Sequence, residues 1–390
     1  MGYRRIPYLI VFEEQGPKDA YGGEVGRVAL EAHLLKPEAP PHAASDTVMI
    51  FMHPIGLGHY LPLPGALAGA GTHTIFCGTR YHGADYNILM EKVVLDLAAC
   101  IRHARDELGY SKIILGGWSG GGSLSLFYQS QAEAPTVTAT PAGDPPDLTK
   151  ADLPAADGVI LVAAHVARAT TLTEWLDPSI LDEDRPLDRD PELNLYDSAN
   201  PHQPPYSQDY LARYRQAQID RNRRITARVE AQLEAFRDAG DDWRELGFVV
   251  QGTMADPRWL DPAADPNGRA PGRCYLGDPR QINDSPIGLA RYSSLRSWMS
   301  QWSIDHSHAD GVACAARTTA PTLVIGNGAD DACTPSHTGR LFDALQQDDR
   351  SCVTIAGANH YYAGQKDKLA ECVTVCQGWL AERGFGSPIG

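Results

Sequence analysis

The sequence predicts an α/β protein with a mostly parallel central sheet, flanking helices and one large, mainly helical insertion. Short runs that are apolar throughout recur along the chain, as in strands buried on both faces of a parallel sheet. Segments with apolar residues at helical spacing alternate with these runs, which is the order of βα units. Between two such units, residues 167–312 have a different composition, rich in Asp, Arg, Pro, Tyr and Trp. We interpret this stretch as the insertion.

The length and charge of the chain exclude several classes of protein. Its 390 residues, 43% of them apolar, are enough for one large domain or two ordinary ones. The net charge of -15 repels nucleic-acid phosphates and anionic lipid. No apolar run approaches the about 20 residues of a membrane helix, and the N-terminus lacks the apolar run of a signal peptide. We therefore expect a cytoplasmic protein that binds neither nucleic acid nor membrane.

The eight cysteines are scattered along the chain and form no C-x-x-C pair. This pattern is typical of buried free thiols in a reducing compartment. Cys372 and Cys376 lie one helical turn apart, which suits two core-facing positions of one helix better than a metal site without other ligands. We expect no metal.

The first part of the chain, residues 1–166, predicts one half of the sheet. Residues 8–12 and 26–35 suit an antiparallel pair at a sheet edge, because a polar, glycine-bearing stretch separates them. Buried strands are predicted at residues 47–52, 73–77, 112–115 and 158–164, and helices at residues 88–108 and 123–132.

The insertion and the second half of the core follow. Within the insertion, Ser207 can cap a helix that runs to about Ala239 and is stopped by Gly240. Residues 313–390 return to alternating elements and complete the sheet. Strands are predicted there at residues 321–325 and 352–355, and helices at residues 337–345 and 366–383.

Residues 117–121 read G-W-S-G-G and fit G-x-S-x-G between a buried strand and a helix. A serine at such a turn has a strained backbone, so small residues two before and two after it let the chain pass. Its hydroxyl faces the N-terminus of the next helix, where free N–H groups stabilise a developing oxyanion. The alternative is a glycine-rich turn with an incidental serine. The flanking strand and helix favour Ser119 as a nucleophile.

With this turn the chain resembles the α/β-hydrolase family, over residues 45–166 and 315–385. Residues 328–335, G-A-D-D-A-C-T-P, are similar to the acid turn G-x-x-D-x-x-x-P of that family, with Asp331 in register and Asp330 as the second choice. Residues 357–360, G-A-N-H, are similar to its histidine loop G-x-x-H. The resemblance implies a triad of Ser119, Asp331 and His360, in the chain order of the family.

The expected roles follow from acid–base chemistry. A serine hydroxyl is a weak nucleophile at neutral pH, so His360 would accept its proton and later deliver it to the leaving group. Asp331 would fix the tautomer of that ring and stabilise the imidazolium.

The oxyanion would be bound by the backbone N–H of Gly120 and, by resemblance, by that of Ile55. Pro54 replaces the glycine of the common His-Gly-X loop of the family. Because the expected donor is the next residue, the loss of one N–H at the proline leaves the oxyanion hole intact. His53 is expected to be a buried histidine that ties loops together.

Several side chains are candidates for the substrate pocket. Trp118 precedes the serine, and His59 and Tyr60 follow the early strand, where loop surface is an equal alternative. In the resembling family, an insertion after the sixth strand forms a cap over the serine, and residues 167–312 occupy that place. Trp298 and Trp302 lie there one helical turn apart. Their rings are expected to form either a pocket wall or the core of the cap.

The resemblance implies a serine hydrolase that cleaves a carboxylic ester, lactone or thioester of a bulky, mostly apolar small molecule through an acyl-serine intermediate. A serine at the turn argues against dehalogenases and epoxide hydrolases of this fold, which use aspartate there. C–C bond hydrolysis of ring-fission products is the alternative on the same triad. A non-catalytic ligand-binding protein is the alternative of another class. No cofactor is expected, and the cap could join copies of the chain into a homo-oligomer.

Overall fold

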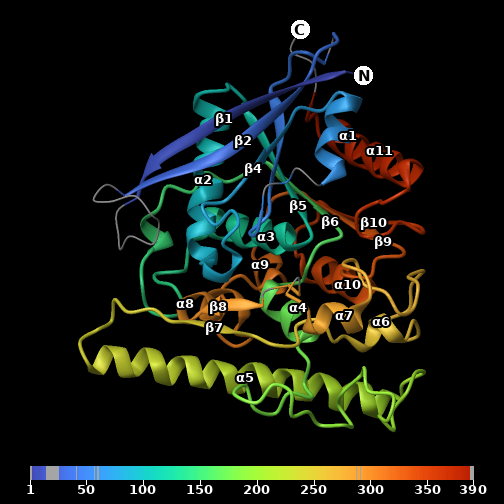
Figure 1. The fold of residues 1–390 in the computed structure, drawn as a ribbon. Coiled ribbons are helices and arrows are strands. Elements are labelled where there is room, and N and C mark those ends of the chain that lie inside the picture. The colour runs from blue at the N-terminus through green and yellow to red at the C-terminus, as the bar shows by residue number, and fades with distance from the viewer. Residues whose placement is uncertain are drawn as a thin grey trace.

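The computed structural model describes residues 2–14, 26–40, 42–56, 58, 61–286, 288–289 and 291–386. An eight-stranded sheet with the order β1-β2-β4-β3-β5-β6-β9-β10 forms its centre (Figure 1). From β4 to β10 all neighbouring strands are parallel, whereas β1 pairs with β2 and β2 with β4 in antiparallel register. The strands are β1 Tyr3–Glu13, β2 Arg27–Pro37, β3 Thr47–Met52, β4 Thr74–Cys77, β5 Lys112–Trp118, β6 Gly158–Val162, β9 Thr322–Asn327 and β10 Arg350–Ile355.

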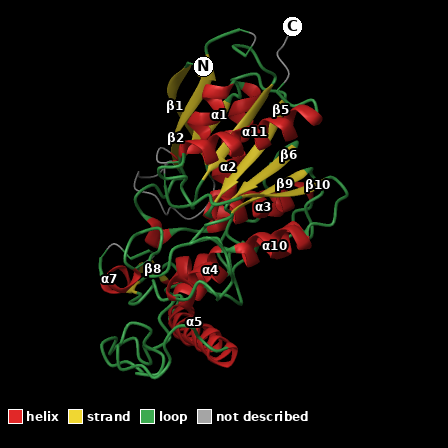
Figure 2. Ribbon diagram, turned by 90° about the vertical axis from the view of Figure 1, so that its right-hand side faces the viewer, coloured by secondary structure: helices red, strands yellow, loops and turns green. Residues whose placement is uncertain are grey.

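Helices cover both faces of this sheet, because successive residues of the buried strands point to opposite sides (Figure 2). Ile50 of β3 lies in the cluster formed with α2 Met90–Asp106, α3 Gly120–Glu133, α9 Gly311–Ala315 and α10 Pro335–Ala344. Phe51, the next residue, lies in the cluster formed with α1 Pro62–Ala70 and α11 Lys366–Glu382. The predicted fold class and edge hairpin are confirmed.

The insertion lies between β6 and β9, at the end of the sheet where the parallel strands finish (Figure 1). An isolated bridge between Ala167 and Asp310 joins its two ends. Its longest element is α5, which Ser207 caps by accepting the N–H of Tyr210 at 3.2 Å and after which Gly240 adopts φ +72°. Its elements are α4 Arg168–Trp175, α5 Gln208–Asp238, β7 Gly247–Val249, α6 Pro257–Leu260, α7 Pro279–Asp284, β8 Tyr292–Ser294, α8 Leu295–Ser297 and the π-helical turn η4 Trp298–Trp302.

Two remaining short turns, η2 Asp85–Asn87 and η3 Leu148–Lys150, are 3₁₀-helical. Cys372 and Cys376 are both buried in the cluster under α11, as their spacing predicts. Among the residues that the structure describes, no helix is long and apolar enough to cross a bilayer.

Candidate active site

Ser119 occupies the turn between β5 and α3 and has φ +52° and ψ −125°. This left-handed backbone is rare for residues with a side chain. A Cβ on Gly117 would lie 2.7 Å from Cα of Gly122, and one on Gly121 would lie 2.5 Å from the carbonyl oxygen of Met52. Both flanking positions therefore require glycine, for the packing reason that the motif implies. The turn holds the serine hydroxyl at the end of β5.

His360 lies in the loop after β10, which is three strands away from β5 in the sheet, and its ring contacts Ser119. Its Nε2 is 3.2 Å from Oγ of Ser119, and its Nδ1 is 3.0 and 2.9 Å from the two carboxylate oxygens of Asp330. Nδ1 therefore carries the proton, and Nε2 accepts the one from the serine. Burial alone lowers the pKa of His360, but the Asp330 carboxylate outweighs it and raises that pKa above the ordinary value.

The structure corrects the expected position of the acid. Asp330, the second choice, contacts His360, and its Oδ1 also accepts the N–H groups of Ala332 and Cys333 at 2.8 Å each. These bonds fix the Asp330 carboxylate toward the ring. Asp331 lines a cavity beside His360, and its Oδ1 has no hydrogen-bond partner among the described residues. Burial, and then the charge of Asp330, raises the pKa of Asp331 to about 6.

The two expected oxyanion donors, Gly120 and Ile55, lie in different surroundings. Gly120 is the first residue of α3, so its N–H has no preceding helical carbonyl to bind. The N–H of Ile55 instead donates to Nδ1 of His53 at 3.3 Å. The expectation of a free second donor at Ile55 is therefore wrong, because the neighbouring imidazole takes up that N–H.

The other ring nitrogen of His53, Nε2, lies close to Gly120. A Cβ on Gly120 would lie 3.0 Å from Nε2 of His53. Burial, and then the charges of Arg168 and His360, lowers the pKa of His53 to about 3, so its ring is neutral. Because Nδ1 accepts from Ile55, the single ring proton is assigned to Nε2. The protonated nitrogen therefore lies close to Gly120.

A buried guanidinium lies beside these groups. Nε and Nη2 of Arg168 donate to Oε1 of Gln301 at 3.1 and 2.7 Å, which holds the head group in place. A Cβ on Gly120 would lie 3.5 Å from Nη1 of Arg168. The positive charge thus lies close to Gly120, the first residue of α3.

A second histidine, which the sequence analysis did not identify, contacts the serine. Nε2 of His165 lies 3.2 Å from Oγ of Ser119, and its backbone N–H donates to the Ser119 carbonyl at 2.9 Å. The available signal was its place directly after β6, which pairs with β5 and therefore ends beside the serine turn.

Aromatic side chains of the insertion join the two histidines. The ring of Trp175 lies 5.6 Å from that of His165 and 5.5 Å from that of Tyr275, measured between centroids. Tyr275 in turn lies 5.7 Å from the ring of His360. Residues of the insertion therefore pack against both histidines that contact the serine.

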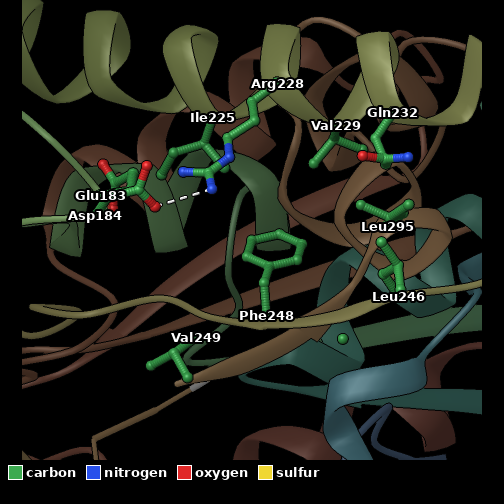
Figure 3. A pocket seen from close by; sticks show the side chains of 11 residues that line it. Glu183, Asp184, Ile225, Arg228, Val229, Gln232, Leu246, Phe248, Val249 and Leu295 are labelled. Atoms are coloured by element: carbon green, nitrogen blue, oxygen red, sulfur yellow. Dashed lines mark hydrogen bonds and ion pairs between the residues drawn. The ribbon is translucent and has the colours of Figure 1, made fainter. Parts of the chain in front are cut away.

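The cavity beside His360 has a volume of about 430 Å³. Tyr275 and Tyr361 supply aromatic wall, while Asp331 and Arg273 supply charge. Its size is in the range of small-molecule sites. A different cavity, about 360 Å³, lies within the insertion between α5 and β7 (Figure 3). Its lining does not include the serine or either histidine.

Three tryptophans expected in the pocket lie in cores. Trp118 is 1% exposed and packs against the rings of Tyr361 and Tyr362 under the sheet. Trp298 and Trp302 are each 0% exposed and stack at 5.1 Å inside the insertion. Trp298 and Trp302 thus take the second of their two expected roles, as core of the insertion, and Trp118 belongs to a core cluster of the sheet. His59 and Tyr60 lie outside the described residues.

The insertion also holds the acid turn. The indole N–H of Trp259 donates to the carbonyl of Asp331 at 2.6 Å, and the side-chain amide of Asn267 donates to that of Asp330 at 2.7 Å. The backbone N–H of Gly268 donates to the carbonyl of Gly328 at 2.8 Å. Two of these hydrogen bonds tie the aspartates, and the third ties Gly328, to residues 259–268.

Among the described residues, Asp330, Cys333 and His360 offer possible metal-ligand atoms within 4.8 Å of one another. Both Asp330 oxygens, however, already accept hydrogen bonds from His360. Burial raises the pKa of the Cys333 thiol well above its ordinary value, which disfavours the thiolate that binds metals. The geometry fits a hydrogen-bonded acid turn better than a metal centre.

No protein-family model matches the chain, and a search of curated proteins finds no significant match. Among solved structures, the α/β hydrolase GrgF from Penicillium sp. sh18 aligns at 9% identity over 98% of this chain and 99% of its own, with a TM-score of 0.51. A ferulic-acid complex of Est1E from Butyrivibrio proteoclasticus aligns at 12% identity over 91% and 96%, with a TM-score of 0.48. A monoacylglycerol lipase from Paleococcus ferrophilus aligns at 15% identity over 98% and 99%, with a TM-score of 0.46. The chain has the α/β-hydrolase fold.

Proposed function

We propose that this protein is a serine hydrolase that cleaves a carboxylic ester, lactone or thioester through an acyl-serine intermediate. One observation carries the proposal. The hydroxyl of Ser119, the ring of His360 and the carboxylate of Asp330 form a continuous, buried hydrogen-bonded chain that starts at a strained strand-to-helix turn. This arrangement activates a serine for attack on a carbonyl carbon.

In the first step, Nε2 of His360 accepts the hydroxyl proton as Oγ of Ser119 bonds to the carbonyl carbon. The imidazolium is stabilised by Asp330 and then protonates the leaving alcohol or thiol. A water molecule attacks the acyl-serine in the second step, giving its proton to His360, which returns it to Oγ. Each cycle consumes one water and restores every side chain, so it needs no cofactor.

The oxyanion is bound in this proposal by the N–H of Gly120 and by Nε2–H of His53. Nε2 of His53 and the guanidinium of Arg168 both lie close to Gly120, and the charge of Arg168 favours an anion there over the ground-state carbonyl. The proposal replaces the donor expected at Ile55, which is engaged by the His53 ring.

The insertion, residues 167–312, acts as the cap of the site. It brings Trp175 against His165 and Tyr275 against His360, and Tyr275 also lines the 430 Å³ cavity. The lining of this cavity includes His360 but not Ser119, and its aromatic rings with Asp331 and Arg273 suit a substrate with an apolar or aromatic part and at least one polar group.

The test is covalent labelling with a fluorophosphonate, followed by hydrolysis of p-nitrophenyl esters of rising chain length. Wild-type protein should be labelled on Ser119, and Ser119→Ala should lose labelling and at least about 10,000-fold in turnover while its melting temperature is retained. Ser130→Ala is the matched control, since Ser130 lies on the same helix α3 but bonds the carbonyl of Phe127 and the thiol of Cys314 rather than the groups of the site.

Folded wild-type protein that resists the phosphonate and hydrolyses no ester would favour a ligand-binding protein. Strong preference for a dienoate ring-fission product over every ester would favour the C–C hydrolase.

A further inference from the structure

The oxygen of Ser119 has two imidazole partners at the same distance. Nε2 of His360 and Nε2 of His165 each lie 3.2 Å from it. The reaction proposed above uses His360 alone. His165 is buried, and no carboxylate bonds it in the described part of the chain, where its Nδ1 has no hydrogen-bond partner. Its proximity to the reacting atom therefore calls for a role different from that of the base.

The number of available protons fixes the direction of the hydrogen bond between His165 and Ser119. The serine hydroxyl has one hydrogen, and Nε2 of His360 accepts it because Nδ1 of that ring is protonated toward Asp330. Nε2 of His165 can then bond the serine only as a donor, into a lone pair of Oγ. The opposite tautomer would set two acceptors against one hydrogen and bury an unpaired N–H at Nδ1.

The surroundings keep His165 neutral and in place. Burial lowers its pKa well below the ordinary value, and the nearby His337, His360 and Arg168 act in the same direction. Its backbone N–H is bonded to the carbonyl of Ser119 at 2.9 Å. Ala163, two residues earlier, has φ +45°, a strained conformation that accumulates at functional sites. The edge of Trp175 packs against the ring.

We propose that His165 is a second catalytic histidine, which donates Nε2–H to the Ser119 oxygen throughout the cycle. The inference rests on the proposed serine hydrolysis. When His360 removes the hydroxyl proton, negative charge develops on Oγ and the bond from His165 strengthens. During deacylation the bond between the acyl carbon and Oγ breaks, and Oγ leaves with the electron pair until His360 reprotonates it. His165 stabilises that leaving oxygen and never gives up its own proton.

The decisive comparison is between His165→Phe and His165→Gln. Phenylalanine keeps a ring of similar size but has no donor, whereas the amide of glutamine places an N–H near the position of Nε2. Burst kinetics with a p-nitrophenyl ester measure acylation and deacylation separately. We expect both rates to fall about 10- to 100-fold in the phenylalanine variant, as for loss of a hydrogen bond to a charged group, and to recover largely in the glutamine variant.

His73→Phe is the matched control. His73 is also buried and hydrogen-bonded, to the Tyr110 hydroxyl, but it lies at the start of β4, away from the strand ends that carry the site. Its loss should leave both rates within a few-fold of wild type. A readout besides activity is the ¹⁵N spectrum of the histidine rings, in which His165 should show a protonated Nε2 and an unprotonated Nδ1.

Normal rates in His165→Phe, equal defects in the phenylalanine and glutamine variants, or a protonated Nδ1 on His165 would each overturn the inference. Wild-type protein that is neither labelled by a fluorophosphonate nor active on esters would instead overturn the proposed function, and the inference with it. Fast labelling of wild type with equally fast labelling of His165→Phe contradicts only the role of His165.

Discussion

Both carboxylate oxygens of Asp330 lie within hydrogen-bonding distance of Nδ1 of His360, at 3.0 and 2.9 Å. The next residue, Asp331, turns its carboxylate to the wall of the adjacent cavity. Two neighbouring acids thus have separate environments. Asp330 accepts N–H groups from Ala332, Cys333 and His360, whereas burial and the charge of Asp330 raise the pKa of Asp331 to about 6.

Exchange of each aspartate for asparagine should separate their roles. Asp330→Asn is expected to lower kcat/KM by about 1,000- to 10,000-fold, because the ring of His360 loses the partner that fixes its tautomer. Asp331→Asn should cost less than about 10-fold, since that side chain does not bond the ring. Steady-state hydrolysis of a p-nitrophenyl ester measures both. An Asp331→Asn variant as inactive as Ser119→Ala would contradict this assignment.

The pH dependence of kcat/KM should follow the ionisation of His360. The base must be neutral, and its pKa is raised above the ordinary value of about 6.5 by Asp330. Activity should therefore fall as the pH drops through a midpoint above about 6.5. In Asp330→Asn, burial remains while the raising charge is gone, so the midpoint of the residual activity should move to lower pH. An unchanged midpoint would show that another group titrates.

The free energy of unfolding should depend on pH because of the raised pKa of Asp331. The pKa of Asp331 is about 6 in the folded protein and lies near its ordinary value of 3.8 in the unfolded chain. Between these values the folded state holds the extra proton, so stability falls as the pH rises through this window, and the full cost is present above about pH 6. Asp331→Asn removes a cost of up to about 3 kcal/mol at pH 8 and almost none near pH 4. Urea unfolding at both pH values checks this, and an equal effect at both would contradict it.

The oxyanion contribution of His53 can be tested in the same assay. His53→Phe removes the proposed Nε2–H donor and should lower kcat by about 10- to 100-fold with little change in KM, because the bond strengthens only as the anion forms. His53→Gln should recover part of the loss. A rise in KM at constant kcat would indicate that His53 contacts the bound substrate rather than the oxyanion.

The framework of the fold could be predicted because its signals are local. Residues 47–52 are apolar at every position, and the structure places β3 Thr47–Met52 there, buried throughout. The cap, length and stop of α5 follow from Ser207 and Gly240 in the same way. Such patterns depend on the spacing of buried residues and on the residues that cap helices, and both can be read from a single sequence.

The side chains of the site are harder to predict from sequence patterns. Asp330 and Asp331 are adjacent and fit the same turn, and only the N–H groups of Ala332 and Cys333 decide which one is aimed at His360. Trp298 and Trp302 share a helical face, but their spacing does not say whether that face meets a cavity or another helix. His165 has no motif around it, and its importance comes from the pairing of β6 with β5.

The hydrogen bonds from Trp259, Asn267 and Gly268 to the acid turn link pocket shape to reactivity. The same stretch of chain that borders the cavity braces the residue that orients the base. A change in residues 259–268 is therefore expected to alter both the substrate selectivity and the reaction rate. Grafting a foreign loop into residues 259–268 to accept another substrate would have to rebuild these braces, or the graft would broaden the choice of substrate only by slowing the reaction.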